Sequence, residues 1–219
     1  MGKLSTSDVS VTGGTIRKEL EPGNKVLKIN SITLDKVPWG ADEWYLNINT
    51  ESEPLGEEFE GFFIDNNDHS KGQYLGQTGR IRASGFTFGD KTVNGREFKR
   101  DDGILKCLKN LFSAMGEQAY IDSIEKETVE QIIDQLNKDQ VWKDKWYNVC
   151  IGGKMYMKDG FVKYDLNLPQ FSKKVPVELV NTVPSRLITF NKEMHIYVSK
   201  SAKEEAPVKK SGKSDFDVE

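Results

Sequence analysis

The residues best suited to chemistry in this chain are arginines and aromatic rings within residues 74 to 88. In an extended strand, alternate side chains share a face. One face of this segment is apolar at Ile81 and Ala83, and the other is basic and aromatic. The second face comprises Tyr74, Thr78, Arg80, Arg82, Ser84, Phe86 and Phe88. Guanidinium groups bind phosphates and flat rings stack on unpaired bases, so this pattern is typical of a surface for single-stranded nucleic acid.

An alternative interpretation of the same segment is an ordinary edge strand with a solvated basic face. Three glycines, Gly76, Gly79 and Gly85, interrupt the pattern. Glycine inside a strand marks a bulge, a bend or a close backbone approach, and small barrels need such bends to close. The glycines also leave open whether the alternation continues through the whole segment.

Motifs for catalysis or metal binding are sparse. Residues 65 to 69 offer oxygen ligands but lack the alternating spacing and distal glutamate of a calcium loop, and residues 89 to 92 lack the spacing of a phosphate loop. The only histidines, His69 and His195, lie far from any plausible nucleophile in the sequence. We therefore expect no enzymatic activity, no cofactor and no metal.

One catalytic alternative stays open, because carboxylates distant in sequence can meet in a fold. A metal-dependent nuclease could be assembled from Asp101, Asp102 and Glu178.

The charge of the chain is unevenly distributed. The net charge is only -3, but residues 40 to 69 contain no Lys or Arg and nine Asp or Glu, whereas residues 72 to 100 hold six cations against two acids. This asymmetry predicts one electropositive region that could receive phosphates.

Several absences indicate a cytoplasmic protein. No apolar run reaches the roughly 18 residues that a membrane helix needs, and the start of the chain lacks the order of a signal peptide. Cys107 and Cys150 lie far apart in apolar patterns, which favours two reduced, buried thiols over a disulfide or a metal site.

The order of predicted elements begins with a flexible arm over residues 1 to 23 and strands over residues 26 to 34, 44 to 49 and 59 to 65. A change of apolar parity predicts a bulge in the first strand. Apolar stripes then predict a helix from residue 101, capped by Asp101 or Asp102 and ended by Gly116, and a second helix after a capping box at Thr128.

Strands return in the second half of the chain. Residues 146 to 151 and 155 to 158 read as strands joined by a hairpin at Gly152 and Gly153, and Asp159 and Gly160 predict the next hairpin. Residues 161 to 168 alternate as a further strand, and residues 186 to 198 predict a hairpin around Asn191.

The fold class expected from this order is mainly β with one or two helices. It is an oligonucleotide-binding (OB) type antiparallel barrel with a helix after the third strand. The domain would cover residues 24 to 199 with a helical insertion at 101 to 138, and residues 200 to 219 would form a disordered tail with an acidic tip.

The chain resembles phage-encoded single-stranded DNA-binding proteins of the OB-fold type over residues 23 to 169. The resemblance rests on the glycine-rich basic segment 76 to 84, the amphipathic helix ending at Gly116, and residues 151 to 169. It implies sequence-independent coating of single-stranded DNA in phage replication or recombination, in the host cytoplasm. It also implies that an acidic, aromatic tail recruits replication or recombination proteins, which here would be Asp215, Phe216, Asp217, Val218 and Glu219.

The function expected from the sequence is therefore binding of single-stranded DNA without base specificity, by a monomer or a homo-oligomer. The expected contacts are Tyr74, Arg80, Arg82, Phe86, Phe88, Arg96, Lys99, Arg100, Tyr156 and Phe161. The alternative outside catalysis is a virion or assembly protein, in which Arg80 and Arg82 form salt bridges.

Overall fold

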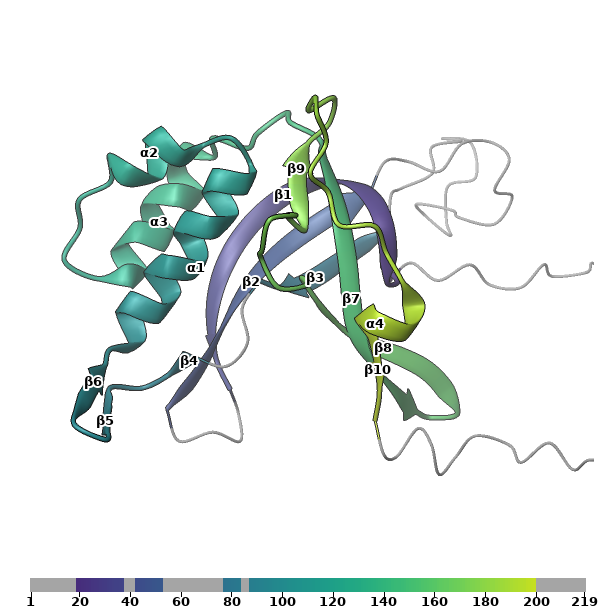
Figure 1. Ribbon diagram of the computed structural model, residues 1–219, viewed down its shortest axis with the longest axis horizontal. Coiled ribbons are helices and arrows are strands. Elements are labelled where there is room, and N and C mark those ends of the chain that lie inside the picture. The colour runs from purple at the N-terminus through teal and green to yellow at the C-terminus, as the bar shows by residue number, and fades with distance from the viewer. Residues whose placement is uncertain (1–18, 38–41, 53–76, 84–86, 200–219) are drawn as a thin grey trace, which may run out of the picture.

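The structure is a computed structural model that describes residues 19 to 37, 42 to 52, 77 to 83 and 87 to 199 (Figure 1). These residues form a mainly β fold with a mixed sheet and four helices. The sequence predicted one or two helices, so the helical content is higher than expected. The predicted strand at residues 59 to 65, the tail and most of the N-terminal arm lie outside the described residues.

Five strands of the large sheet close into a ring. They are β1 (Gly23–Lys36), β2 (Glu43–Ser52), β3 (Thr78–Arg82), β7 (Tyr147–Lys158) and β8 (Phe161–Asn167). The strands pair in the order β1, β2, β3, β8, β7, and β7 pairs back to β1. Helices α1 to α3 lie between β3 and β7 in the chain.

The prediction of a purely antiparallel sheet is wrong. Within the ring β3 and β8 run parallel, joined in register only at Arg82 and Asn167, and β10 (Ile196–Val198) also runs parallel to β7. The reason is topological: strand directions cannot alternate all the way around a closed ring with an odd number of members. One parallel neighbour is therefore required.

The first two strands follow the sequence pattern. β1 has the predicted bulge, where its register with β2 shifts between Ile29 and Ser31. On β2, Leu46 and Ile48 are buried in the core, while Asn47 and Asn49 take the alternate face.

Short strands extend the ring. β4 (Thr87–Phe88) pairs with β2, and β9 (Val177–Leu179) pairs with β7. A separate hairpin of β5 (Lys91–Val93) and β6 (Arg96–Phe98) turns at Asn94 and Gly95, which both have positive φ.

The helices form a layer on one side of the ring (Figure 1). They are α1 (Arg100–Ala114), α2 (Gln118–Asp122) and α3 (Val129–Asp139), while the one-turn α4 (Lys192–His195) lies beside β10. As predicted, α1 buries Ile104, Leu108, Leu111 and Phe112 and α3 buries Val129, Ile132, Ile133 and Leu136.

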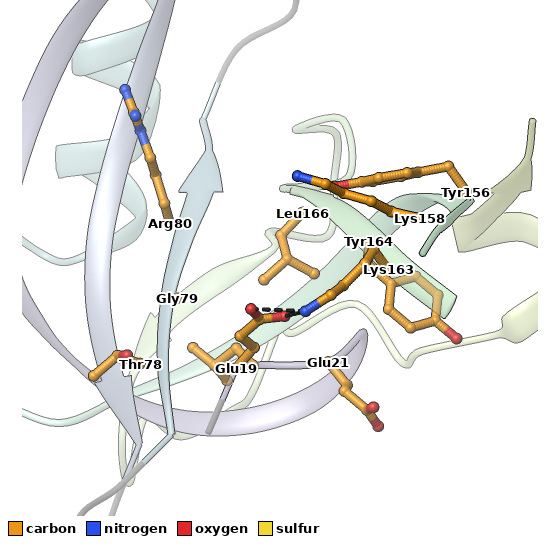
Figure 2. A pocket seen from close by; sticks show the side chains of 11 residues that line it. Glu19, Glu21, Thr78, Gly79, Arg80, Tyr156, Lys158, Lys163, Tyr164 and Leu166 are labelled. Carbon is orange, nitrogen blue, oxygen red and sulfur yellow. Dashed lines mark hydrogen bonds and ion pairs between the residues drawn. The ribbon is translucent and has the colours of Figure 1, made fainter. Parts of the chain in front are cut away.

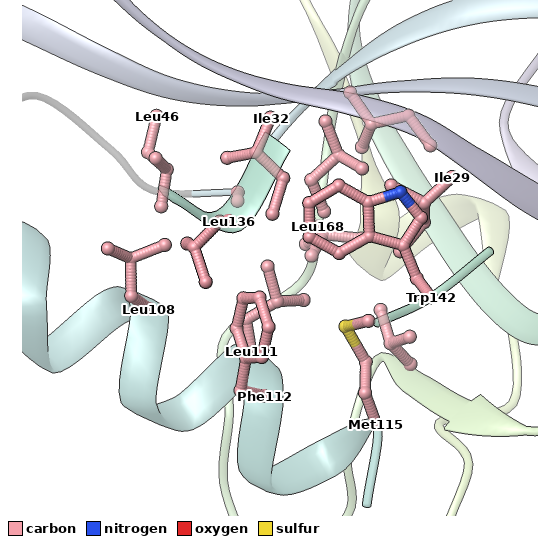
Figure 3. Packing of buried hydrophobic residues seen from close by; sticks show 14 of the residues in the cluster. Ile29, Ile32, Leu46, Leu108, Leu111, Phe112, Met115, Leu136, Trp142 and Leu168 are labelled. Carbon is pink, nitrogen blue, oxygen red and sulfur yellow. The ribbon is translucent and has the colours of Figure 1, made fainter. Parts of the chain in front are cut away.

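The helices and the inner face of the ring share one hydrophobic core. Figure 3 shows Leu108 and Phe112 of α1 close to Leu46 and Ile32 of the strands, with Trp142 beside them. Asn137 of α3 fixes this contact, because its side chain accepts a hydrogen bond from the backbone N–H of Ile32 (2.9 Å) and donates one to the Ile32 carbonyl (2.7 Å). The inner face of the ring is therefore part of the hydrophobic core.

The start of α1 is capped from outside the helix. Neither Asp101 nor Asp102 is the capping residue, which corrects the prediction: the N-cap is Lys99, whose side chain makes no capping bond. Instead the Asp90 carboxylate accepts the Arg100 backbone N–H at 3.0 Å. The pKa of Asp90 lies below its ordinary value. The largest cause is this hydrogen bond from Arg100, and the hydrogen bond from the Lys99 side chain lowers the pKa further.

The predicted capping box at the start of α3 is present in modified form. The Thr128 hydroxyl accepts the Gln131 backbone N–H at 3.3 Å, as the motif requires. The Gln131 side chain, however, accepts from the N–H of Glu127 at 3.2 Å, one residue earlier than in the standard box.

Two predicted hairpins in the second half are wrong, and a neighbouring one is confirmed. β7 continues through Gly152 and Gly153, whereas β7 and β8 are joined by the predicted turn at Asp159 and Gly160, both with positive φ. Gly152 serves a close approach instead, since a Cβ there would lie 2.8 Å from the backbone oxygen of His195.

The hairpin predicted around Asn191 is the helical turn α4. The Asn191 side chain accepts the Glu193 backbone N–H at 2.9 Å and caps this turn. The chain then enters β10, which pairs with β7 rather than with the segment before it.

Both cysteines are thiols outside any disulfide: Cys150 is buried, and the half-buried Cys107 donates to the Ala83 carbonyl at 3.3 Å. Burial raises the pKa of the Cys150 thiol to about 11. Among the described residues, no helix is both long enough and apolar enough to cross a membrane.

The close approach at Gly152 yields a stability prediction. Gly152→Ala places a methyl group against the His195 backbone oxygen and forces α4 and β10 away from β7. We expect the free energy of unfolding to fall by roughly 1 to 3 kcal/mol, as for other overpacked sites, in a urea titration followed by tryptophan fluorescence. Ser113→Ala, at an exposed site near the end of α1, should change it by less than about 0.5 kcal/mol. Equal stability of Gly152→Ala and wild type would contradict this account.

Candidate nucleic-acid interface

The outward face of β1, β2 and β3 is polar. Because the inner face packs against the helices, every second residue of these strands points away from the core. On β2 and β3 the facing pairs are Asn47 with Arg82 and Asn49 with Arg80. The two arginines are thus carried on one face of β3, with Ile81 fully buried between them, as the sequence predicted.

Arg82 stacks on an aromatic ring. Its guanidinium carbon lies 3.6 Å from the centroid of the Tyr45 ring on the neighbouring strand β2. Tyr45 is only 8% exposed, and burial, partly offset by Arg82, raises the pKa of its hydroxyl. The ring fixes the plane of the guanidinium, which keeps a flat cationic surface at this position.

Arg80 is held by a carboxylate on the same sheet. Asp35 of β1 forms an ion pair with Arg80 and accepts hydrogen bonds from Asn47 (2.6 Å) and Thr33 (2.9 Å). Burial raises the pKa of Asp35, but these hydrogen bonds and the charge of Arg80 outweigh it and hold the pKa below its ordinary value. Any anion that bound Arg80 would therefore compete with Asp35.

A cleft opens between β3 and the β7–β8 hairpin. The parallel strands β3 and β8 meet at Arg82 and Asn167 and then diverge. Two adjoining hollows of about 320 and 450 Å³ occupy this gap, and they share Arg80, Tyr164 and Leu166 as lining residues. We call these joined hollows the β3–β8 cleft.

The far wall of the β3–β8 cleft carries lysines and tyrosines together with one carboxylate, Asp165 of β8. Figure 2 shows Tyr156 and Lys158 of β7 next to each other, with Lys163 and Tyr164 of β8 nearby. Tyr156 faces Lys163 directly across the two strands. Burial raises the pKa of the Tyr156 hydroxyl above its ordinary value.

A segment before β1 crosses one end of the β3–β8 cleft. The Leu20 N–H donates to the Thr78 carbonyl at 3.0 Å, and the Leu20 side chain packs on Gly79 of β3. Both carboxylate oxygens of the neighbouring Glu19 accept from the Lys163 ammonium, at 2.9 and 2.7 Å (Figure 2). The Lys163 ammonium is therefore already paired with a carboxylate.

Four of the residues predicted from the sequence lie at or beside the β3–β8 cleft. Arg80, Arg82 and Tyr156 line it. Phe161 is 63% exposed and faces Lys158 at the end of the β7–β8 hairpin.

The other described candidates lie away from the β3–β8 cleft. Arg96 and Lys99 are on or beside the β5–β6 hairpin, which Figure 1 shows on the opposite side of the view from β8. Phe88 of β4 lies under the Lys91 ammonium, 3.7 Å from its ring centroid.

Arg100 also lies away from the β3–β8 cleft and is paired with other side chains. Its guanidinium pairs with Asp101 (2.7 Å) and Glu130 (2.8 Å) and lies 4.9 Å from the centroid of the Trp44 ring. Tyr74, Phe86 and the tail residues 215 to 219 lie outside the described residues.

The structure adds cleft residues that sequence reasoning did not select as candidates. These are Lys36, Tyr45, Asn47, Lys158, Lys163 and Tyr164. Except for Lys36, these residues lie in segments that the sequence predicted as strands. The sequence did not show which strands face each other across the cleft, because that depends on the order in which the strands of the ring pair.

A metal centre finds no support in the described part of the chain. No three His, Cys, Asp or Glu side chains there come together in a way that could hold a metal ion. Glu178 is buried on β9, where its carboxylate accepts from the Ser185 hydroxyl and the Arg186 N–H. Asp101 instead pairs with Arg100.

Comparisons with protein-family models, curated proteins and solved structures find no match to this chain. The geometry of the β3–β8 cleft therefore carries the functional argument.

The environment of Asp35 yields a pH prediction. A depressed pKa in the folded state stabilises the protein above the ordinary carboxyl value, and this stabilisation is lost as the pH falls from about 4 through the lower folded value. Asp35→Asn should lower the free energy of unfolding at pH 7, by less than about 1 kcal/mol because the Asp35 side chain is 40% exposed.

The check is urea unfolding of wild type and Asp35→Asn between pH 7 and pH 2. We expect the difference between the two proteins to shrink as the solution is acidified. Asp134→Asn, at an exposed position on α3, serves as the control. A difference that stays constant over this pH range would show that Asp35 does not stabilise the fold through its charge.

Proposed function

We propose that this chain binds single-stranded DNA without base specificity, and that its ring of strands is an OB-type barrel. The observation that carries the proposal is the β3–β8 cleft, where arginines, lysines and tyrosines from neighbouring strands line one groove. Cations along a groove contact phosphates, and aromatic rings beside them stack on bases of any sequence.

The strand order supports the OB-type assignment. OB barrels have five strands and bind oligonucleotides over the second and third, flanked by the loops after the first and fourth. Counting along the chain, β2 and β3 are the second and third strands of this ring, and the turn at Asp159 follows the fourth. Arg80 and Arg82 lie on this surface.

The magnitudes are sufficient for useful affinity. Each base stacked on an aromatic ring contributes about 1 to 3 kcal/mol. Tyr156, Tyr164 and the guanidinium of Arg82 on Tyr45 offer flat surfaces for this purpose. Two or three stacks with four or five phosphate contacts would give micromolar binding or better and a slope of log affinity against log salt near -3, at about -0.7 per phosphate.

The biological setting extends this proposal. By the resemblance noted above, the protein would coat single strands in phage DNA replication or recombination, and residues 215 to 219 would recruit partner proteins.

One observation favours an alternative, a virion or assembly protein. The ion pair of Arg80 with Asp35 is the kind of salt bridge expected if this face serves protein contacts. A protein without affinity for single strands at low salt would support that alternative.

The deciding experiment is a fluorescence titration of the full chain with oligo-dT and with a duplex of equal length, at several salt concentrations. We expect saturable binding of the single strand and weak binding of the duplex. Absence of binding to both at low salt would overturn the proposal.

A double variant tests the β3–β8 cleft itself. Arg80→Gln with Arg82→Gln should weaken oligo-dT binding about tenfold or more, because two cations are lost from the groove, and reduce the salt slope by about 1.4. The matched control is Lys126→Gln with Lys138→Gln, which removes two exposed cations from the helical side. Equal losses in the two double variants would indicate that only net charge matters.

A further inference from the structure

A second basic and aromatic surface lies on the far part of β7. The alternate residues Lys154, Tyr156 and Lys158 share one face of this strand. Tyr156 and Lys158 line the β3–β8 cleft, whereas Lys154 lines a separate and larger hollow of about 1220 Å³. The face of β7 that carries Lys154, Tyr156 and Lys158 therefore connects the larger hollow with the β3–β8 cleft.

The larger hollow lies between α1, the segment after β8, and α4 with β10; we call it the C-terminal cleft. Among its described lining residues are four lysines and one carboxylate, Glu193. The lysines are Lys106, Lys154, Lys173 and Lys174, and all four are exposed. The C-terminal cleft therefore attracts anions despite the negative net charge of the chain.

An exposed aromatic ring accompanies these lysines. Tyr197 of β10 is 67% exposed and adjoins Lys154 in the register of β10 with β7. Such exposure gives a base access to the ring. Asn110, Asn167 and Gln170 also line the C-terminal cleft and add neutral hydrogen-bonding groups.

We infer that the C-terminal cleft is a second contact region for the same nucleic-acid strand, which passes from the β3–β8 cleft along β7 and over Tyr197. This inference rests on the proposed function and extends it. Continuity favours nucleic acid over an acidic peptide, because the cations on β7 are spaced about 13 Å apart between Lys158 and Lys154, with Tyr156 between them. One extended polyanion can follow that row without leaving the surface.

The test compares a short and a long oligo-dT, of about 6 and about 16 nucleotides, which fall within the range of site sizes for an OB fold. The variant is Lys154→Gln, Lys173→Gln, Lys174→Gln. We expect affinity for the long strand to fall at least tenfold and its salt slope to decrease by about 2, at about 0.7 per phosphate, with less than twofold change for the short strand. Tyr197→Ala should weaken binding of the long strand alone, by about fivefold or more.

The control is Lys126→Gln, Lys138→Gln, Lys143→Gln, which removes three exposed lysines from the helical side. It should bind both strands as wild type does, apart from a small loss common to both lengths.

Each outcome separates this inference from the proposed function. Wild-type protein that binds neither strand overturns the proposed function and this inference with it. Wild-type protein that binds both strands, with no selective loss for the long strand in the triple variant, overturns the inference alone. Lysine-dependent binding of a polyglutamate peptide, with binding of the long strand unchanged in the triple variant, would assign the C-terminal cleft to an acidic protein segment and overturn the nucleic-acid path.

Discussion

Closure of the five-strand ring is the constraint on which the rest of this structure depends. An odd ring needs one parallel contact, and here it falls between β3 and β8, which meet in register only at Arg82 and Asn167. Beyond that point the two strands diverge. The β3–β8 cleft is the gap between these two strands, which share a single residue pair. The candidate site therefore follows from the way the sheet closes.

Packing decides which face of the ring is available. The helices α1 and α3 fill the inner side with a single apolar core, and Asn137 fastens α3 to the backbone of Ile32. The outward face of β2 and β3 then carries side chains that make hydrogen bonds or stack, such as Asn47 and Arg82. Rigid strands position these groups more accurately than loops could.

Carboxylates partly neutralise the charge of the basic surfaces. Asp35 pairs with Arg80, and Glu19 pairs with Lys163 at the other end of the β3–β8 cleft. These exposed pairs are weak in water, so a polyanion with many phosphates could displace them by its combined contacts. In the C-terminal cleft, by contrast, four lysines accompany the single carboxylate among the described lining residues.

Local pattern in the sequence was enough to predict the five ring strands and the two longer helices, but not α2, β5, β6 or β9. The alternation around Ile81, the bulge in β1, the apolar faces of α1 and α3 and the turn at Asp159 depend on neighbouring residues, and all are present. Local pattern failed at Gly152, because a glycine in a strand pattern can indicate either a turn or a close approach of another backbone segment. Gly152 looked like a turn, but its lack of a side chain admits the backbone of His195 from more than 40 residues away.

The tertiary structure alone decided which side chains share a surface. Arg80, Arg82 and Tyr156 meet at one cleft because β3 pairs with β8, while Arg100 is drawn to Glu130 and Trp44 on the helical side. The same pairing brings in Tyr164 and Lys163, which no local motif marked. The sequence determined the periodicity of each strand and helix, since that depends on residues a few positions apart. The order in which the strands pair depends on contacts distant along the chain, and only the folded structure contains them.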